Sequence, residues 1–212
     1  MRYILVSFFV FFLSFNAQAK IQDILDVMCD ICGNSLGWRI EVAKDDHLIE
    51  NTLDVYRREI ASTIHEIGGN DLTDEQILQM GMNQSIILKD KIKKGTGCLL
   101  AFRDIQTQDV IGSLFLDEVI TKDKQLVWDL RAFGLYKEYK KDPDSIKKGL
   151  FPAIKGAAIT MFVDKIASSG KNDEEFMINK LLLDLGFERD DEYFTLDRPA
   201  GLVKYFSMKL KD

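Results

Sequence analysis

The 212-residue chain contains only three cysteines and three prolines. So few cysteines exclude a disulfide-rich scaffold, and so few prolines among 46% apolar residues exclude a collagen-like or proline-rich disordered chain. Positive charge is also scarce, because 28 Lys and Arg stand against 34 Asp and Glu. The net charge of −6 argues against a nucleic-acid binder. No long internal repeat is present, and the length suits one well-buried domain or at most two small ones.

Long apolar runs are missing except at the N-terminus. Arg2 is followed by an apolar run over residues 3–15 and then by Ala17-Gln18-Ala19. A positive start, a short apolar run and an Ala-x-Ala end are the three parts of a secretory signal peptide, and the run is shorter than the roughly 20 residues of a membrane-spanning helix. We expect residues 1–19 to be cleaved after Ala19, with export to the periplasm or the medium and no membrane contact afterwards. An uncleaved N-terminal anchor is the alternative.

The first half of the remaining chain has one strand pattern and two helix patterns. Residues 20–37 form a lead-in segment, and residues 38–42 alternate apolar and polar side chains as a strand does. Apolar residues then recur at steps of three and four from Ile49 to Ile67, which predicts a helix ended by glycines. Thr73 and Gln76 have the spacing of a capping box that opens a second helix, ending at Gly95.

The second half alternates strands with helices. The expected elements are a hairpin of strands 98–102 and 110–116, a strand 126–135, a helix 151–166 ended at 168–170, a possible strand 175–178, a helix 179–185 and strands 193–196 and 203–210. This order predicts an α/β or α+β domain over residues 38–212. Its twisted sheet has six or seven strands, mostly antiparallel with one parallel crossing, and is flanked by helices.

Three local phrases in this order resemble the GNAT-type N-acetyltransferase superfamily. Residues 100–102 with 109–114 are similar to its second and third strands, where a hairpin is followed by an Ile-Gly pair. Leu185-Gly186-Phe187 is similar to its turn before the sixth strand, and residues 205–210 to its closing strand. The resemblance runs from residue 38 to the C-terminus and implies a mixed sheet with two splayed parallel strands.

The resemblance also implies a cofactor and a reaction. Acetyl-coenzyme A would lie between the splayed strands, with its pyrophosphate on backbone N–H groups where a helix begins, because that helix end is positive and has unsatisfied donors. The chain would transfer the acetyl group to an amine of a small molecule or a protein. The implied cofactor-binding residues are Leu135, Lys147, Lys148, Gly149 and Leu150.

Acetyl transfer needs a neutral amine and a protonated leaving thiolate. Asp129, or Glu118 in the Asp117-Glu118 pair, is the candidate general base, and Tyr193 is the candidate acid. The alternative is a purely structural role, with the carboxylates at solvated strand ends and Tyr193 as a half-buried aromatic residue of a strand.

Three residues favour a second interpretation. Ile146, Phe151 and Leu182 occupy positions where the family pattern has Gln or Arg, a small residue, and a catalytic Tyr. An exported GNAT fold without catalytic activity, acting as a binding or effector module, is therefore the alternative to the transferase.

The Cys29-x-x-Cys32 pair admits several roles. A structural disulfide, two buried thiols or a redox-cycling pair of a periplasmic protein would each fit this spacing in an exported chain. Zinc would need two more ligands, and Cys98, His47 and His65 stand at no recognised spacing, so no metal is expected.

Overall fold

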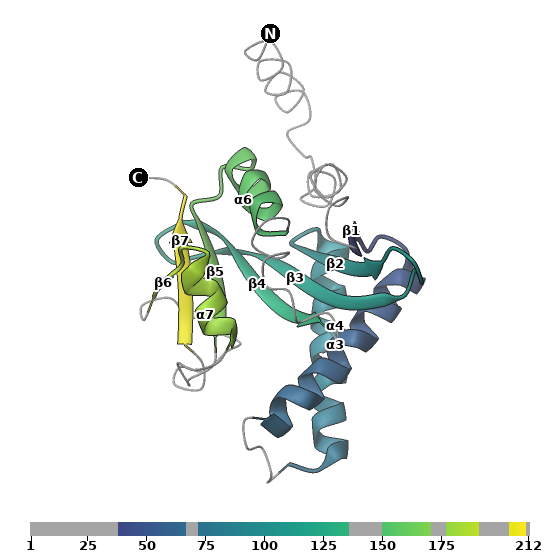
Figure 1. Cartoon of the computed structure of the whole chain (residues 1–212). Coiled ribbons are helices and arrows are strands. Elements are labelled where there is room, and N and C mark those ends of the chain that lie inside the picture. The colour runs from purple at the N-terminus through teal and green to yellow at the C-terminus, as the bar shows by residue number, and fades with distance from the viewer. Residues whose placement is uncertain (1–37, 67–71, 136–149, 171–176, 191–203, 211–212) are drawn as a thin grey trace.

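The computed structural model describes residues 38–66, 72–135, 150–170, 177–190 and 204–210 (Figure 1). The first 37 residues, including the expected signal peptide and the Cys29 and Cys32 pair, lie outside this part, as does the predicted strand 193–196. The described elements, in chain order, are β1 Trp38–Val42, α3 Asp46–Glu66, α4 Asp74–Lys94, β2 Gly97–Asp104, β3 Val110–Ile120, β4 Leu126–Leu135, α6 Phe151–Thr160, β5 Lys165–Gly170, α7 Met177–Asp184, β6 Glu188–Arg189 and β7 Lys204–Lys209.

The described strands form one seven-stranded sheet in the order β1-β2-β3-β4-β5-β7-β6. Every registered neighbour pair is antiparallel except β4 with β5, which run parallel. The crossover from β4 to β5 passes through α6, because parallel strands need a connection that returns the chain to the same edge. The predicted fold class is confirmed.

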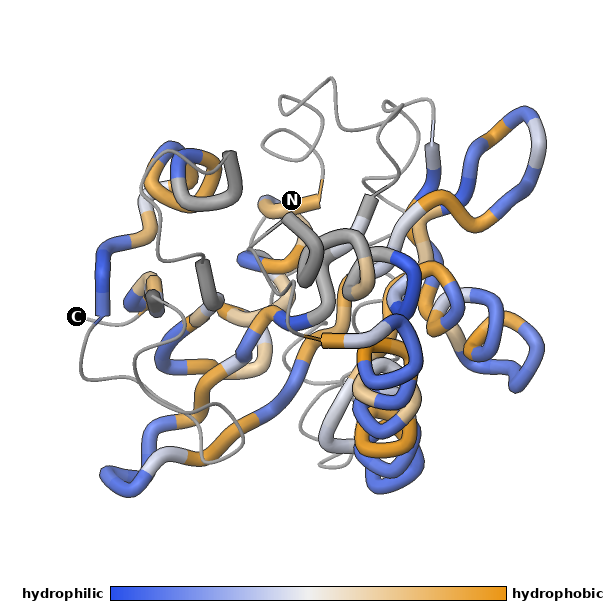
Figure 2. The backbone as a smooth tube through the Cα atoms, turned by 90° about the horizontal axis from the view of Figure 1, so that it is seen from below, coloured by the Kyte–Doolittle hydropathy of each residue, from blue (hydrophilic) through white to orange (hydrophobic). Residues whose placement is uncertain are grey.

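The helices pack on both faces of the sheet. On one face, α3 and α4 cover a small core that contains Leu53, Leu99 and Phe115. On the other face, α6 and α7 bury a larger core around Trp128 and Ile166. Hydrophobic residues predominate along the central strands and hydrophilic ones in the turns (Figure 2). Both faces of the central strands are thus buried, which explains their nearly continuous apolar sequence.

The N-terminal helices follow the sequence prediction closely. The Thr73 hydroxyl accepts a hydrogen bond from the Gln76 N–H at 3.2 Å, and the Gln76 side chain accepts one from the Thr73 N–H at 2.8 Å. This is the predicted capping box, and α4 ends at Gly95 with a φ of 72°. Among the described residues, no helix is both long and apolar enough to span a membrane.

The predicted helix 151–166 is wrong over its last six residues. Helix α6 ends at Thr160, where the N–H groups of Phe162 and Val163 donate to the Ile159 and Ala158 carbonyls at 3.1 and 2.9 Å. These bonds form a helix-ending motif whose left-handed position usually holds glycine, but here Phe162 occupies it with a φ of 57°. Because no glycine marks this helix end in the sequence, the apolar spacing predicted that the helix continues to residue 166. Residues 165–170 form β5 instead.

Two smaller corrections concern the C-terminal third. The possible strand 175–178 is wrong at its end, because Met177 and Ile178 begin α7. The short strand β6 was not predicted, although the preceding turn at Gly186, with a φ of 86°, ends α7 as expected. These errors leave the order of layers unchanged.

Candidate functional site

The parallel strands β4 and β5 diverge within the sheet. Their register covers residues 127–130 of β4 and 165–168 of β5, and the Ser168 hydroxyl donates to the Leu130 carbonyl at 3.4 Å. Both strands continue past this point within the described residues, β4 to Leu135 and β5 to Gly170, while β5 keeps its register with β7. Leu130 and Ser168 therefore mark the vertex of a V that opens toward the carboxyl ends of the two strands.

A bulge in β4 accounts for this divergence. Ser113 and Phe115 lie two positions apart on β3, whereas their partners Gly134 and Arg131 lie three positions apart on β4. One extra residue in β4 bends that strand and increases its twist, so that it follows β3 and leaves β5. The bulge begins at Arg131, immediately beyond the vertex.

Helix α6 begins without a side-chain cap. Leu150 is its N-cap residue and makes no side-chain capping bond, and Pro152 in the first turn has no N–H to donate. Leu150 and Phe151 are both buried in the larger core, where the Phe151 ring lies 5.3 Å from the Phe187 ring at 54°. Because Pro152 has no N–H, the first turn of α6 carries the backbone N–H groups of Phe151 and Ala153.

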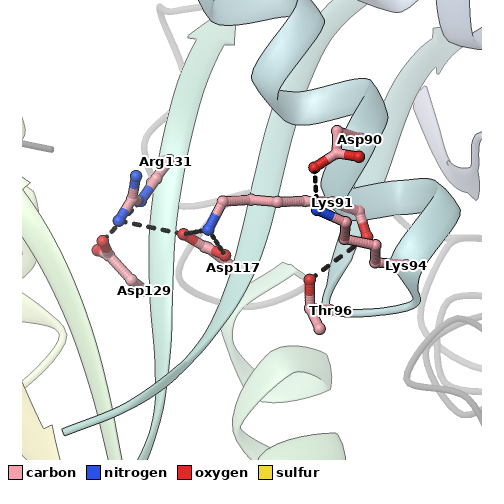
Figure 3. A network of polar contacts seen from close by, with 7 residues as sticks. All are labelled: Asp90, Lys91, Lys94, Thr96, Asp117, Asp129 and Arg131. Atoms are coloured by element: carbon pink, nitrogen blue, oxygen red, sulfur yellow. Dashed lines mark hydrogen bonds and ion pairs between the residues drawn. The ribbon is translucent and has the colours of Figure 1, made fainter.

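A buried ionic network lies beside the vertex, on the face that α3 and α4 cover (Figure 3). Asp117 of β3 and Asp129 of β4 are direct partners in the strand register, and both are fully buried. Lys91 of α4 donates to both Asp117 oxygens at 2.8 and 2.9 Å. Arg131 joins the two carboxylates, with Nη2 3.1 Å from Asp117 and Nε 2.7 Å from Asp129.

The network is balanced in charge. Among the described residues it contains two carboxylates and two cations, and the Arg131 side chain is only 6% exposed. Buried charges are tolerated when opposite charges and hydrogen bonds match them, whereas a lone buried charge is very costly. Lys91 reaches the network from the last turn of α4, so the ion pairs also tie this helix to β3 and β4.

No protein-family model matches the chain, and no curated protein matches its sequence. Solved structures do match its fold. An acetyltransferase from Streptococcus agalactiae superposes with a TM-score of 0.61 over 82% of this chain and 99% of its own, at 15% identity. A PaiA N-acetyltransferase from Thermoplasma acidophilum, solved in complex with coenzyme A, gives 0.57 over 80% and 98%, also at 15% identity. A GNAT-family acetyltransferase from Staphylococcus aureus gives 0.56 over 81% and 99%, at 13% identity.

The chain has a GNAT fold. Within that fold, the structure places some of the predicted cofactor residues and not others. Leu135 is the last residue of β4 and Leu150 caps α6, so the two bracket the connection between these elements. Lys147, Lys148 and Gly149 lie outside the described residues.

The two candidate bases, Asp129 and Glu118, lie on opposite faces of the sheet in this GNAT fold. Asp129 faces α3 and α4 within the ionic network, whereas Glu118 pairs with Trp128 across the ladder and lies on the opposite face. Trp128, the strand partner of Glu118, is on the order of 20 Å from the predicted cofactor residue Leu135 along β4, given the rise of a strand. Tyr193 lies outside the described residues. Of the two candidates within the described residues, Asp129 is the one adjacent to the vertex.

Two members of the network, Lys91 and Arg131, were missed by sequence reasoning. Asp129 and Arg131 interrupt an otherwise apolar strand at alternate positions, which places both on one face. Charges in a strand that is buried on both faces must be paired, so this alternation was the available signal. Lys91 belongs to a helix that is remote from these strands in the sequence, and no local pattern indicates that it contacts Asp117.

The described part of the GNAT fold also includes Leu182 and Cys98, which entered the alternative interpretations of the sequence. Leu182 is buried in the larger core and contributes no acidic group there. The described residues contain no cluster of three or more side chains able to hold a metal ion, and Cys98 is a buried residue of β2.

Proposed function

We propose that this protein is an acyltransferase that moves an acetyl group from acetyl-coenzyme A to an amine. One observation carries the proposal, namely the V that opens beyond Leu130 and Ser168. Past that vertex the two strands no longer pair with each other, and an extended arm that carries amide groups can pair with such strand edges. The coenzyme A complex of the Thermoplasma acidophilum neighbour supports the same interpretation.

The described residues fit the two ends of this cofactor differently. Residues 131–135 of β4 would hold the pantetheine arm through their backbone, and the start of α6 would receive the anionic end through the Phe151 and Ala153 N–H groups. Pro152 removes one donor from that turn, so we assign Lys147 and Lys148 to the remaining phosphate charge. When bound, acetyl-coenzyme A supplies an activated thioester and a thiol as leaving group.

The ionic network suggests how the acceptor amine is handled. Each buried carboxylate already has a cation, so the described part of the network has no surplus negative charge with which to attract an ammonium ion. We assign Asp129 to holding Arg131 beside the vertex. A neutral amine would form the new C–N bond with its lone pair while the C–S bond of the thioester breaks, and the proton that the amine loses would end on the departing thiolate. The acceptor class, a small molecule or a protein, stays a prediction.

The first test is binding of the cofactor. Millimolar acetyl-coenzyme A at about 100 times its dissociation constant should raise the melting temperature of the purified protein by about 5–10 °C. ADP, which lacks the pantetheine arm, is the matched control and should produce little shift. Release of coenzyme A thiol with an amine present should then report turnover. Absence of any shift with acetyl-coenzyme A would contradict the transferase.

The second test concerns Asp129. Asp129→Asn should lower the free energy of unfolding by about 1–3 kcal/mol, because the bond to Arg131 loses its charge. We expect kcat to change by less than about tenfold and the pH–rate profile to keep its shape. Asp190→Asn, which alters the Lys165 ion pair at 2.8 Å, is the control for a similar loss of charge elsewhere. A fall in kcat of about 100-fold with loss of the acidic limb would show that Asp129 is the general base.

A second function, a binding module without catalysis, is favoured by Leu182. Its aliphatic side chain is buried in the core at the position that the resemblance assigns to the catalytic acid. An exported protein would also meet acetyl-coenzyme A only in the cytosol of another cell. Isolation of a defined protein partner that carries no acetyl group, without a thermal shift from the cofactor, would select this function.

A further inference from the structure

Helix α4 carries an exposed apolar stripe beside the side that faces the core. Leu78, Met82 and Ile86 are spaced four residues apart and are 57%, 47% and 65% exposed. The buried residues of this helix lie on another side of it; they are Ile77, Gly81, Ser85 and Leu88. The α3–α4 hairpin extends past the edge of the sheet, so this stripe stands on a projecting part of the molecule (Figure 1). Contiguous exposed apolar residues of this kind mark interaction surfaces.

Charges flank the stripe in a defined order. Glu75, Met82 and Lys89 are separated by seven residues each, or about two helical turns, so all three lie on the same side of α4. The first turn of the helix is acidic, with Asp74 and Glu75, and the last turn is basic. Lys89 contacts Glu50 of α3, yet about a third of its side chain stays exposed, since it is 34% accessible.

We propose that α4 is the docking surface for a second copy of this chain, in an antiparallel arrangement with its two-fold axis at Met82. Leu78 of one copy then lies opposite Ile86 of the other, because both stand four residues from Met82. Glu75 lies opposite Lys89 for the same reason, at a distance of seven residues. Such a contact uses the same surface on both copies, as a two-fold dimer requires.

The order of charges along α4 favours the antiparallel arrangement over a parallel one. A parallel pairing would place Glu75 against Glu75 and Lys89 against Lys89, and like charges at a contact are unfavourable. In the antiparallel pairing, Glu75 of each copy meets Lys89 of the other. The positive N-terminus of each helix also lies beside the negative C-terminus of its partner. The proposal does not depend on acyl transfer, because α4 packs against β2 and α3 and its apolar stripe stays exposed.

Sedimentation equilibrium of the purified protein tests the proposal. We expect the unmodified chain to form dimers in the micromolar range. Met82→Glu should raise the dimer dissociation constant by about 100-fold or more, because two like charges would meet at the axis. Met80→Glu is the matched control: Met80 is 46% exposed, nearly the same as Met82, but lies two residues away on the opposite side of the helix. It should leave dimerisation unchanged.

A cross-linking experiment tests the position of the axis. Under mild oxidation, Met82→Cys should form a disulfide-linked dimer, since the two residues meet at the two-fold axis, whereas Met80→Cys should not. A chain that stays monomeric up to about 100 μM, or equal sensitivity to both Glu variants, would overturn the proposal. Binding of an amphipathic helix of another protein by a monomer would likewise overturn the self-association.

Discussion

Asp117→Ala is expected to lower the free energy of unfolding by about 3–5 kcal/mol. Asp117 is fully buried and is the one carboxylate that contacts both cations of the network, Lys91 and Arg131. Its removal deprives both Lys91 and Arg131 of this carboxylate, and the Arg131 side chain is only 6% exposed. Urea unfolding followed by circular dichroism measures this change.

A matched control lies close to this network. Asp90 forms an ion pair with Lys94 at 2.6 Å on the surface of α4, and both side chains are more than half exposed. Asp90→Ala should change the unfolding free energy by about 0.5 kcal/mol or less, since exposed ion pairs contribute little. Similar losses for Asp117→Ala and Asp90→Ala would show that the buried network does not support the fold.

Gly97→Ala is expected to destabilise the protein by about 3 kcal/mol, at the upper end for an overpacked core. A Cβ at Gly97 would lie 2.3 Å from the Phe115 Cζ and 3.2 Å from the Lys91 Cβ. Phe115 is fully buried in the core under α3 and α4, so its ring has little room to move. Thermal and urea unfolding of the variant would measure the loss.

Two further variants separate the steric cause from a general intolerance of alanine. Phe115→Leu shortens the clashing side chain, so the double variant Gly97→Ala/Phe115→Leu should lose less than the sum of the two single changes. Gly95→Ala meets no atom within 4 Å and should cost only about 1 kcal/mol, from the left-handed φ of 72°. Strict additivity in the double variant would refute the clash with Phe115.

The elements that the sequence predicted well are those with local signals. The helix over α4 was bounded by the Thr73–Gln76 capping box and by Gly95, both of which involve contacts within a few residues. The alternation in β1 and the hairpin of β2 and β3 were likewise correct. Helix α6 was extended too far because Phe162, and not glycine, holds the left-handed position that ends it.

The candidate site was predicted less completely, because its geometry depends on distant residues. Asp129 was identified as chemically notable, but its bond to Arg131 and the contact of Lys91 with Asp117 were not. The latter pair is 26 residues apart in the chain, and its members come from a helix and a strand. A pairing of that kind depends on how the helix crosses the sheet, which the local pattern does not specify.

The amino-acid sequence by itself determined the order of strands and helices, the mixed sheet and the GNAT resemblance, since periodicity, caps and turns act over short distances. Only the tertiary structure decided where β4 leaves β5 and which charges meet beside that vertex. The bulge between Arg131 and Gly134 arises from the register with β3, and the ionic network forms because α4 is packed over the same strands. Both depend on cross-strand register and on burial, which exist only once the sheet has assembled.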